Sequence, residues 1–168
     1  MAEFGFTENL PVVLISGGSR GARSINTAMI DILVAAEKNP VAQFLHVTGK
    51  GEFDAVTQKL KDAGFSFDAP NVKVVPYLYN MPQAMAMANL AIFRAGATGL
   101  AELTARGVPA ILIPYPFAAE NHQEFNAQAL VKVGAARMIL NKDLNAEILK
   151  STLDELLAEP AALQKMAA

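Results

Sequence analysis

A glycine-rich turn between a predicted strand and a predicted helix is the feature that most constrains the fold of this chain. Residues 11–29 read PVVLISGGSRGARSINTAM, so an apolar run leads directly into Gly17 and Gly18, and a helical pattern begins soon after Gly21. Such a turn places the free N–H groups and the positive dipole end of a helix where they favour a bound anion. The sequence therefore predicts a phosphate site early in the chain.

The rest of the chain repeats this alternation of short apolar runs and longer helical patterns. The runs VVLIS, FLHVT, VKVV, LAIF, AILI and ARMIL are typical of strands that are buried on both faces of a sheet. The helical patterns occupy residues 22–38, 52–63, 81–88, 98–105, 122–133 and 145–157. Gly64, Gly107 and Gly134 stand where helices are expected to end in a left-handed residue. We predict one Rossmann-like α/β domain over residues 1–168, built on a doubly wound, six-stranded parallel sheet.

Composition argues against several classes of function. The net charge is −2 with both signs interspersed, which is not the basic footprint of a nucleic-acid-binding protein. Cysteine is absent, which excludes disulfides and thiolate metal sites. The most apolar stretch, VPAILIPYPFAA, contains three prolines and is too short to cross a bilayer, and the first residues lack the pattern of a signal peptide. We expect a soluble domain that binds no nucleic acid and does not itself insert into a membrane.

The first glycine turn fits two families, and one of them is the short-chain type of NAD(P)-dependent oxidoreductase. Three features oppose that family. Ala22 and Arg23 stand where a third glycine is expected, no acidic residue follows the second predicted strand, and no tyrosine is followed four residues later by a lysine. A Walker-type phosphate loop is also missing, because Lys50 is followed by Gly51. The oxidoreductase is kept as the less favoured alternative.

A second strand–glycine–helix segment, FRAGATGLAE, indicates what the first one binds. The small residues from Gly96 to Gly99 let backbone N–H groups approach a ligand closely. Glu102 lies one turn inside the predicted helix, where its carboxylate can accept hydrogen bonds from two vicinal hydroxyls. Two phosphate-type turns at one edge of an open parallel sheet predict a nucleotide site.

A third segment, AAENHQEFNA, follows a predicted strand and opens another helix. Asn121 and Glu124 have the spacing of a capping box, which predicts that the helix begins there. His122 and Gln123 then face the same edge of the sheet as the two glycine turns. A diphosphate, a diol and a polyhydroxylated ring suit these groups together, so the sequence indicates a nucleotide sugar as the ligand.

These segments, with HVTGKG, VVPYLYNMP and NHQEFNAQAL, resemble the C-terminal half of the MurG family of bacterial GT-B glycosyltransferases over nearly the whole chain. That family transfers N-acetylglucosamine from UDP-GlcNAc to a lipid-linked peptidoglycan precursor, converting lipid I to lipid II with inversion. The resemblance implies that this chain is the UDP-GlcNAc-binding half of such an enzyme, in the bacterial cytoplasm, with the parent enzyme peripheral on the cytoplasmic face of the inner membrane.

The resemblance also implies a role for each part of the site. The first glycine turn holds the phosphates, the Leu78 backbone with Met81 nearby faces the uracil, Glu102 binds the ribose hydroxyls, and Gln123 binds the GlcNAc hydroxyls. The implied donor-binding residues are Gly18, Ser19, Arg20, Leu78, Met81, Ala97, Thr98, Gly99, Leu100, Ala101, Glu102, His122 and Gln123. Three positions depart from the family pattern, since Arg20 replaces a common glutamine, Gly99 a threonine or serine, and Asn80 an aspartate.

The family's N-terminal half carries the proposed catalytic base, the acceptor site and the membrane-contacting patch. We therefore assign no catalytic residue to this chain, and expect it to be an excised domain that is inactive alone and meets lipid I only through that other half. A natural subunit of a split UDP-sugar glycosyltransferase is the alternative. No metal or other cofactor is expected, because the chain has no Asp-x-Asp pair and helix N-termini can neutralise the phosphates.

Several other polar and aromatic residues are given structural interpretations. We expect His46 to be a core or edge residue, Tyr77 and Tyr79 to pack in their loop, and Asn126 to secure the start of its own helix. The methionines of MPQAMAM are expected to pack their helix. Two interpretations of Arg94 stay open: contact with a phosphate, or pairing with a neighbouring loop.

Overall fold

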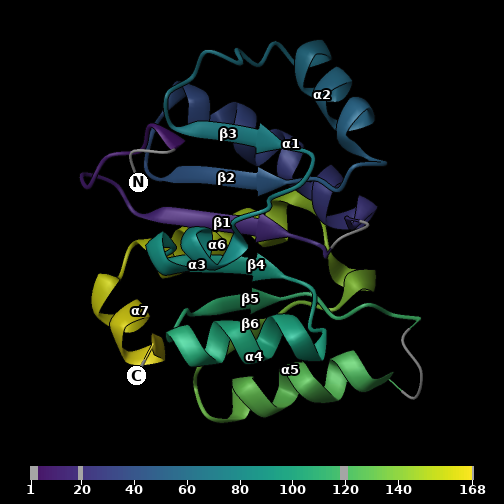
Figure 1. The fold of residues 1–168 in the computed structure, drawn as a ribbon, viewed down its shortest axis with the longest axis vertical. Coiled ribbons are helices and arrows are strands. Elements are labelled where there is room, and N and C mark those ends of the chain that lie inside the picture. The colour runs from purple at the N-terminus through teal and green to yellow at the C-terminus, as the bar shows by residue number, and fades with distance from the viewer. Residues whose placement is uncertain (1–3, 19–20, 118–120, 168) are drawn as a thin grey trace.

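The computed structural model describes residues 4–18, 21–117 and 121–167 of the 168-residue chain. Strands and helices alternate along the described chain, as the pattern of apolar runs predicts (Figure 1). The strands are β1 (Val12–Ser16), β2 (Gln43–Val47), β3 (Val72–Val75), β4 (Leu90–Phe93), β5 (Ala110–Leu112) and β6 (Ala136–Met138). The helices are α1 (Arg23–Lys38), α2 (Phe53–Asp62), α3 (Met81–Met87), α4 (Ala97–Arg106), α5 (His122–Lys132), the short 3₁₀ helix η3 (Asn141–Asp143), α6 (Ala146–Leu157) and α7 (Pro160–Ala167).

All six strands are parallel and form one sheet in the order β3-β2-β1-β4-β5-β6. Strand β1 lies at the centre, where Val13 pairs with Phe44 of β2 on one side and with Leu90 of β4 on the other. The chain builds the sheet outward from β1 in one direction and then, from β4 onward, in the other. This is the strand order of a doubly wound, Rossmann-like sheet, which confirms the predicted fold class.

The four inner strands are buried on both faces and are mostly apolar, with Ser16, Gln43 and His46 as buried polar exceptions. The edge strands β3 and β6 are only partly buried and carry Lys73 and Arg137. All five residues of β1 are buried, with Val13 and Ile15 in one core and Val12 and Leu14 in the other. Helices α1, α2, α6 and α7 contribute to the first core, and α3, α4 and α5 to the second (Figure 1). Alternation of side chains across a strand explains why neighbouring residues enter different cores.

Three predicted helix ends are confirmed. Gly64, Gly107 and Gly134 have φ values of 84°, 65° and 79°, in the left-handed region that glycine adopts without a steric cost. The sequence stretch after Pro160 was not predicted as a helix, and here it forms α7, with Leu163 buried against the first core. Proline suits the first position of a helix because it has no N–H to lose there.

Candidate functional site

The two glycine turns lie side by side at the carboxyl edge of the sheet. They follow β1 and β4, which are neighbours, and the order of strands reverses between them. In an open α/β sheet, ligands bind in the crevice at this reversal, outside the carboxyl ends of the strands. All strands point to the right-hand edge of Figure 1, where the connecting loops gather. The topology therefore places both predicted phosphate turns in one site.

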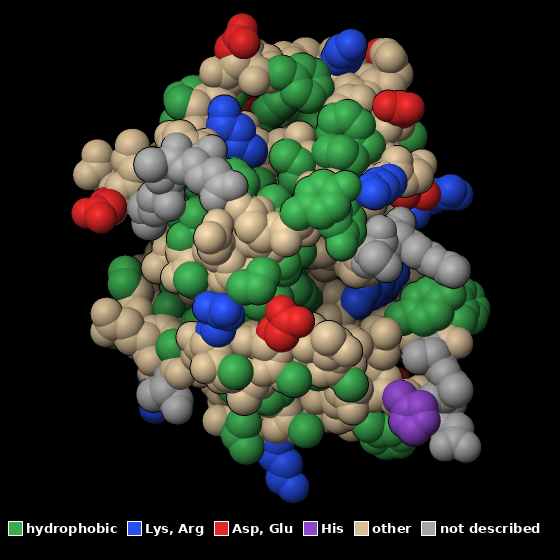
Figure 2. Space-filling model, viewed as in Figure 1, with side chains coloured by type: hydrophobic (Ala, Val, Ile, Leu, Met, Phe, Trp, Pro, Cys, Tyr) green, Lys and Arg blue, Asp and Glu red, His purple; other side chains and the backbone are tan. Residues whose placement is uncertain are grey.

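A cavity of about 1150 Å³ opens at this edge. Its lining comes from the β3–α3 segment, from the two glycine turns with the start of α4, and from the β5–α5 segment. Because the strands stand in the order β3-β2-β1-β4-β5, the β3–α3 and β5–α5 segments form opposite ends of the cavity, with the two turns between them. On the face shown in Figure 2, basic and acidic side chains are scattered among hydrophobic ones. The residues that line the cavity are Ser16, Gly17, Gly18, Gly21, Ala22, Arg23, Ser24, Val47, Glu52, Tyr77, Leu78, Met81, Met85, Phe93, Arg94, Gly96, Thr98, Gly99, Glu102, Tyr115, Pro116, Phe117, Gln123 and Asn141.

The first turn requires glycine at two positions, for close packing at Gly17 and for a left-handed backbone at Gly18. A β-carbon on Gly17 would lie 2.4 Å from the β-carbon of Ala22, and Gly18 has a φ of 95°. Ala22 precedes α1 without making a side-chain cap, so its side chain satisfies none of the first-turn N–H groups. Gly18 lines the cavity, whereas Ser19 and Arg20 lie outside the described residues.

The second turn begins α4 in the same way. Gly96 precedes the helix in an extended conformation and makes no side-chain cap. Thr98 and Gly99 in the first turn of α4 line the cavity. The neighbouring Ala97 and Ala101 are exposed and Leu100 is buried in the second core, so the side chains of these three predicted residues do not line it. The structure thus selects one face of the predicted segment 97–102.

Glu102 lies on the cavity wall, one turn into α4, as predicted. Its side chain is partly buried. No described residue forms a hydrogen bond or ion pair with its carboxylate. A partly buried carboxylate without a protein partner is available to accept hydrogen bonds from a ligand. Leu78 and Met81, the predicted neighbours of the base, line the same cavity on the side of α3.

Gln123 lines the far end of the cavity, and the protein fixes its amide. Its Oε1 accepts the N–H of Ala95 at 3.2 Å and the N–H of Tyr115 at 2.9 Å. Because the oxygen is used twice, the Nε2 group is the part of the amide left to meet a ligand. His122, which precedes it, is exposed and does not line the cavity.

The predicted capping box at the start of α5 is wrong. Asn121 has a φ of 57° and makes no side-chain cap. A side chain can cap a helix only when the backbone of its residue is extended. Asn121 has instead the left-handed conformation, which asparagine tolerates, so its side chain cannot form the cap. The helix nevertheless begins at His122, as the pattern predicted.

The structure confirms the pairing of Arg94 with neighbouring loops, and Arg94 also lines the cavity. Its Nη1 donates to the carbonyls of Ile113 and Pro114, each at 3.2 Å, and to Asn141 Oδ1 at 2.9 Å. Its Nη2 donates to Ser24 Oγ at 3.1 Å. Burial lowers the pKa of this guanidinium, which has no ion pair with a described carboxylate. Arg94 therefore ties together four segments at the carboxyl edge.

Two other side chains hold the loops behind the site. Asn126 donates from Nδ2 to the Ala95 carbonyl at 3.2 Å, so it secures the second turn rather than its own helix start. His46 is fully buried as expected, with Nε2 2.8 Å from Asn26 Oδ1. Burial lowers the pKa of His46 to about 4, so it is neutral at ordinary pH.

The sequence interpretation missed several aromatic and polar residues of the cavity. Tyr77 lines it and also packs on Tyr79, as expected, with ring centroids 4.8 Å apart. Tyr115 and Phe117 line the opposite end and form a second pair. A Pro-Tyr dipeptide directly after a predicted strand, Pro76-Tyr77 and Pro114-Tyr115, was the available signal for each pair. The missed residues are Arg23, Ser24, Glu52, Tyr77, Met85, Phe93, Tyr115, Phe117 and Asn141.

Within the described ranges, no group of three His, Asp or Glu side chains is placed to hold a metal ion. Nor does any helix there have the length and apolar character needed to cross a bilayer.

Sequence comparisons identify similar proteins over nearly the whole chain. The model of the glycosyltransferase family 28 C-terminal domain matches residues 12–168. The UDP-N-acetylglucosamine--N-acetylmuramyl-(pentapeptide) pyrophosphoryl-undecaprenol N-acetylglucosamine transferase of Desulfitobacterium hafniense (strain DSM 10664 / DCB-2) is 48% identical over 163 residues, which are 97% of this chain and 44% of the relative. The protein of the same name from Halothermothrix orenii is 44% identical over 168 residues, 99% of this chain and 45% of the relative. The chain thus spans less than half the length of these curated relatives.

Solved structures of similar proteins have the same fold as this chain. MurG from Acinetobacter baumannii superposes with a TM-score of 0.80 at 28% sequence identity, over 99% of this chain and 46% of that one. The UDP-GlcNAc 2-epimerase from Neisseria meningitidis, solved with UDP-GlcNAc, superposes with a TM-score of 0.65 at 18% identity, over 99% of this chain and 41% of that one. At the lower identity the likeness concerns the fold alone.

Proposed function

The chain belongs to the glycosyltransferase family 28 C-terminal domain family, and from this premise we propose that residues 1–168 form the UDP-GlcNAc-binding domain of a bacterial N-acetylglucosaminyltransferase. The parent enzyme would transfer GlcNAc to undecaprenyl-pyrophosphoryl-N-acetylmuramoyl-pentapeptide and so convert lipid I to lipid II. The family assignment replaces the oxidoreductase alternative.

One observation carries the proposal for this domain. Two helices whose N-termini lack side-chain caps, α1 and α4, begin at adjacent glycine turns on one cavity. Their free N–H groups and dipoles suit the two phosphates of a nucleoside diphosphate. Glu102 on the same wall suits the vicinal hydroxyls of a ribose.

The rest of the cavity supplies complementary surfaces for the two ends of the donor. Leu78, Met81 and Met85 form an apolar end that suits a flat base. Gln123 presents an amide donor at the opposite end, where a sugar hydroxyl can accept. We assign the uracil to the first end and the GlcNAc to the second.

In the reaction, this half would bind the donor and stabilise the leaving group. As the bond from the anomeric carbon to the diphosphate breaks, negative charge grows on the UDP oxygens. Backbone N–H groups and helix dipoles fixed around those oxygens stabilise this charge without having to reorganise. The general base that deprotonates the acceptor hydroxyl would come from the other half of the parent enzyme.

We further propose that the parent enzyme works in the bacterial cytoplasm, on the inner face of the inner membrane, and meets lipid I through that other half. A split enzyme, with this chain as a natural subunit, remains the alternative. The two differ in whether a separately encoded N-terminal partner exists in the source cell.

The proposal is tested by isothermal titration of the purified chain with UDP-GlcNAc, UDP and NADPH. We expect UDP-GlcNAc and UDP to bind weakly and with one-to-one stoichiometry, and NADPH not to bind. Binding of NADPH in preference to both uridine nucleotides would contradict the proposal.

A further inference from the structure

Two polar side chains fix the backbone around Tyr115 at the far end of the cavity. The N–H of Tyr115 donates to Gln123 Oε1 at 2.9 Å. The carbonyls of the two preceding residues, Ile113 and Pro114, accept from Arg94 Nη1 at 3.2 Å. The chain is therefore held on both sides of the peptide that leads into Tyr115.

The Tyr115 ring is also held, although it is partly open to solvent. The guanidinium carbon of Arg94 lies 5.6 Å from the ring centroid, within the range of a cation–π contact. The Phe117 ring packs edge-on, with the centroids 5.7 Å apart and an angle of 75° between the planes. Tyr115 remains 45% exposed and lines the cavity. An aromatic ring fixed before a ligand arrives loses little conformational entropy on binding.

The groups beside this ring define the kind of ligand that fits. Gln123 has its Oε1 occupied by two backbone N–H groups, so it offers Nε2 donors at the same end of the cavity. A pyranose ring presents hydroxyl oxygens around its rim and C–H groups on its faces. The hydroxyls can accept from the amide, while the weakly positive C–H groups pack on the negative face of an aromatic ring.

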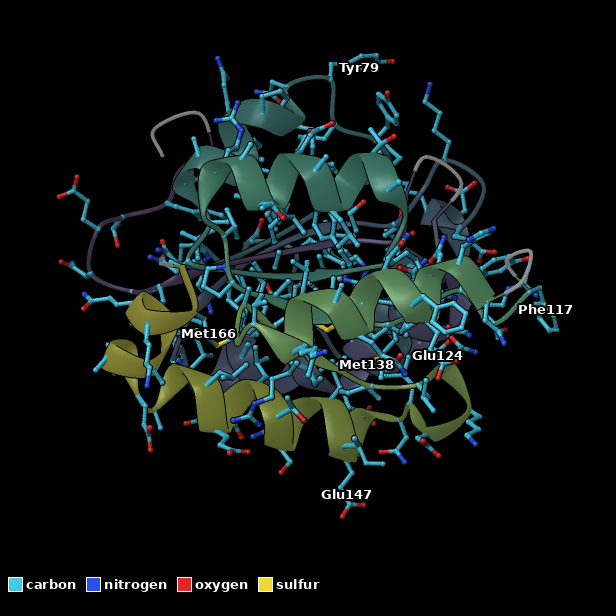
Figure 3. All side chains as sticks on the ribbon, turned by 90° about the horizontal axis from the view of Figure 1, so that it is seen from below. Tyr79, Phe117, Glu124, Met138, Glu147 and Met166 are labelled. Carbon is cyan, nitrogen blue, oxygen red and sulfur yellow. The ribbon has the colours of Figure 1, made fainter. Side chains whose placement is uncertain are left out.

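The opposite end of the cavity does not offer this combination. Its aromatic residue, Tyr77, lies among Leu78, Met81 and Met85, and no side-chain amide lines that end. Figure 3 shows Tyr79, which packs on Tyr77, well apart from Phe117, which packs on Tyr115. The pairing of an aromatic face with an amide donor thus distinguishes the Tyr115 end.

We propose that Tyr115 is the platform on which the hexose of the donor packs, and that Arg94 and Gln123 position this platform. The inference rests on the proposed function, which assigns the sugar to this end of the cavity. Tyr115 then determines how much affinity the sugar adds to that of UDP alone.

The test compares the affinities of UDP and UDP-GlcNAc for the parent chain and for variants, by titration calorimetry. Tyr115→Ala is expected to lower the affinity for UDP-GlcNAc by about five- to tenfold, the scale of one lost aromatic contact, and to leave that for UDP within about twofold. Tyr115→Phe keeps the ring and is expected to match the parent. Tyr79→Ala removes an aromatic side chain that is 85% exposed and does not line the cavity, and it is the matched control.

Each result decides one point. An unchanged ratio of the two affinities in Tyr115→Ala overturns the platform, as does a parent chain that gains nothing from the sugar. A parent that binds neither ligand overturns the proposed function instead. If Tyr115→Ala fails to fold, its affinity for UDP falls as well. Tyr115→Leu, which keeps the apolar bulk without a flat face, is then used instead. Tyr115→Leu must bind UDP-GlcNAc more weakly than the parent does while its affinity for UDP is retained.

Discussion

Gly21 faces the backbone carbonyl of Thr48 so closely that a β-carbon on Gly21 would lie 2.0 Å from that oxygen. Gly21 also has a φ of 80°. The contact joins the first glycine turn to the end of β2, and Asn26 Nδ2 donates to the same Thr48 carbonyl at 2.9 Å. The path of the glycine turn is therefore set by the neighbouring strand as well as by its own sequence.

Gly21→Ala is expected to lower the free energy of unfolding by more than about 2 kcal/mol, because it adds a backbone clash to the cost of a left-handed alanine. Gly64→Ala is the matched control, with a φ of 84° and no atom within 4 Å of the added carbon. It should cost only about 1–2 kcal/mol. Urea unfolding of the two variants measures the difference, and equal losses would show that the Thr48 contact is unimportant.

Glu102→Ala is expected to weaken UDP binding by about tenfold or more, since a carboxylate that accepts from hydroxyls contributes roughly 1.5–3 kcal/mol. The melting temperature of the free domain should change little, because no described residue bonds to this carboxylate. Titration with UDP and with its 2′-deoxy analogue measures the effect. Because the analogue lacks one of the two ribose hydroxyls, its affinities for the parent and for Glu102→Ala should differ less than those of UDP.

Glu147→Ala provides the protein-side control for this measurement. Glu147 lies in the first turn of α6, exposed and pointing away from the rest of the molecule (Figure 3). The Glu147→Ala substitution removes one negative charge, as Glu102→Ala does, but at a residue that does not line the cavity. Equal UDP affinity for Glu102→Ala and Glu147→Ala would mean that Glu102 does not bind the ribose.

The stability of the domain should depend on pH through His46. Burial lowers the pKa of His46 from 6.5 to about 4. Between these values the unfolded chain binds more protons than the folded one, so the free energy of unfolding falls as the pH is lowered from 6.5 toward 4. The contribution is about 3 kcal/mol, fully present above pH 6.5 and lost near pH 4.

His46→Gln should flatten this dependence, whatever its effect on stability at neutral pH. Urea unfolding at several pH values provides the measurement. If the free energy of unfolding of His46→Gln still falls as the pH is lowered from 6.5 toward 4, then other groups cause the pH dependence.

The fold was predictable from local sequence because each element carries its own signal. The apolar runs of β1 and β4 identify strands buried on both faces, and the glycines after α2, α4 and α5 end helices in ways that depend only on neighbouring residues. Helix α7 lies beyond the last predicted helix, residues 145–157, and it begins at Pro160, because proline suits the first position of a helix.

The site was less predictable because its details depend on contacts between distant segments. Arg94 bonds to residues 19, 20, 47 and 70 positions away, and no local pattern encodes those partners. The position of Tyr115 in the cavity depends on Gln123 and Arg94 in the same way. Along α4, the pattern 97–102 was predicted as a block, whereas the helix turns Leu100 into the core.

Transferase activity should be absent from this chain alone. In the proposed enzyme the general base and the acceptor site belong to the other half, so the chain is expected to bind UDP-GlcNAc without transferring the sugar to a lipid I analogue. Adding the N-terminal half of a relative in trans tests whether the two can be recombined, with radiolabelled GlcNAc incorporation as the readout. Robust turnover by the chain alone would contradict the division of labour proposed above.

Gly99 lacks the side-chain hydroxyl that the family resemblance leads us to expect as a hydrogen-bond donor to the diphosphate. Gly99 lies within α4, and a β-carbon there would be 3.6 Å from Phe93 Cδ2, an ordinary van der Waals distance. The β-carbon of Gly99→Thr therefore has room, and the variant should strengthen UDP binding, by about three- to tenfold for one added hydrogen bond. Gly99→Val, which has the same shape without the hydroxyl, is the matched control and should not strengthen UDP binding.

Arg20 lies outside the described residues, and we predict that its charge compensates for the missing hydroxyl of Gly99. Arg20→Gln should then weaken UDP binding more at low than at high salt, because an exposed charge is screened over about a Debye length. Gly99→Thr should restore affinity in the Arg20→Gln background. If calorimetry at two salt concentrations finds Arg20→Gln equal to the parent in both, the first turn holds its phosphate by backbone donors without help from Arg20.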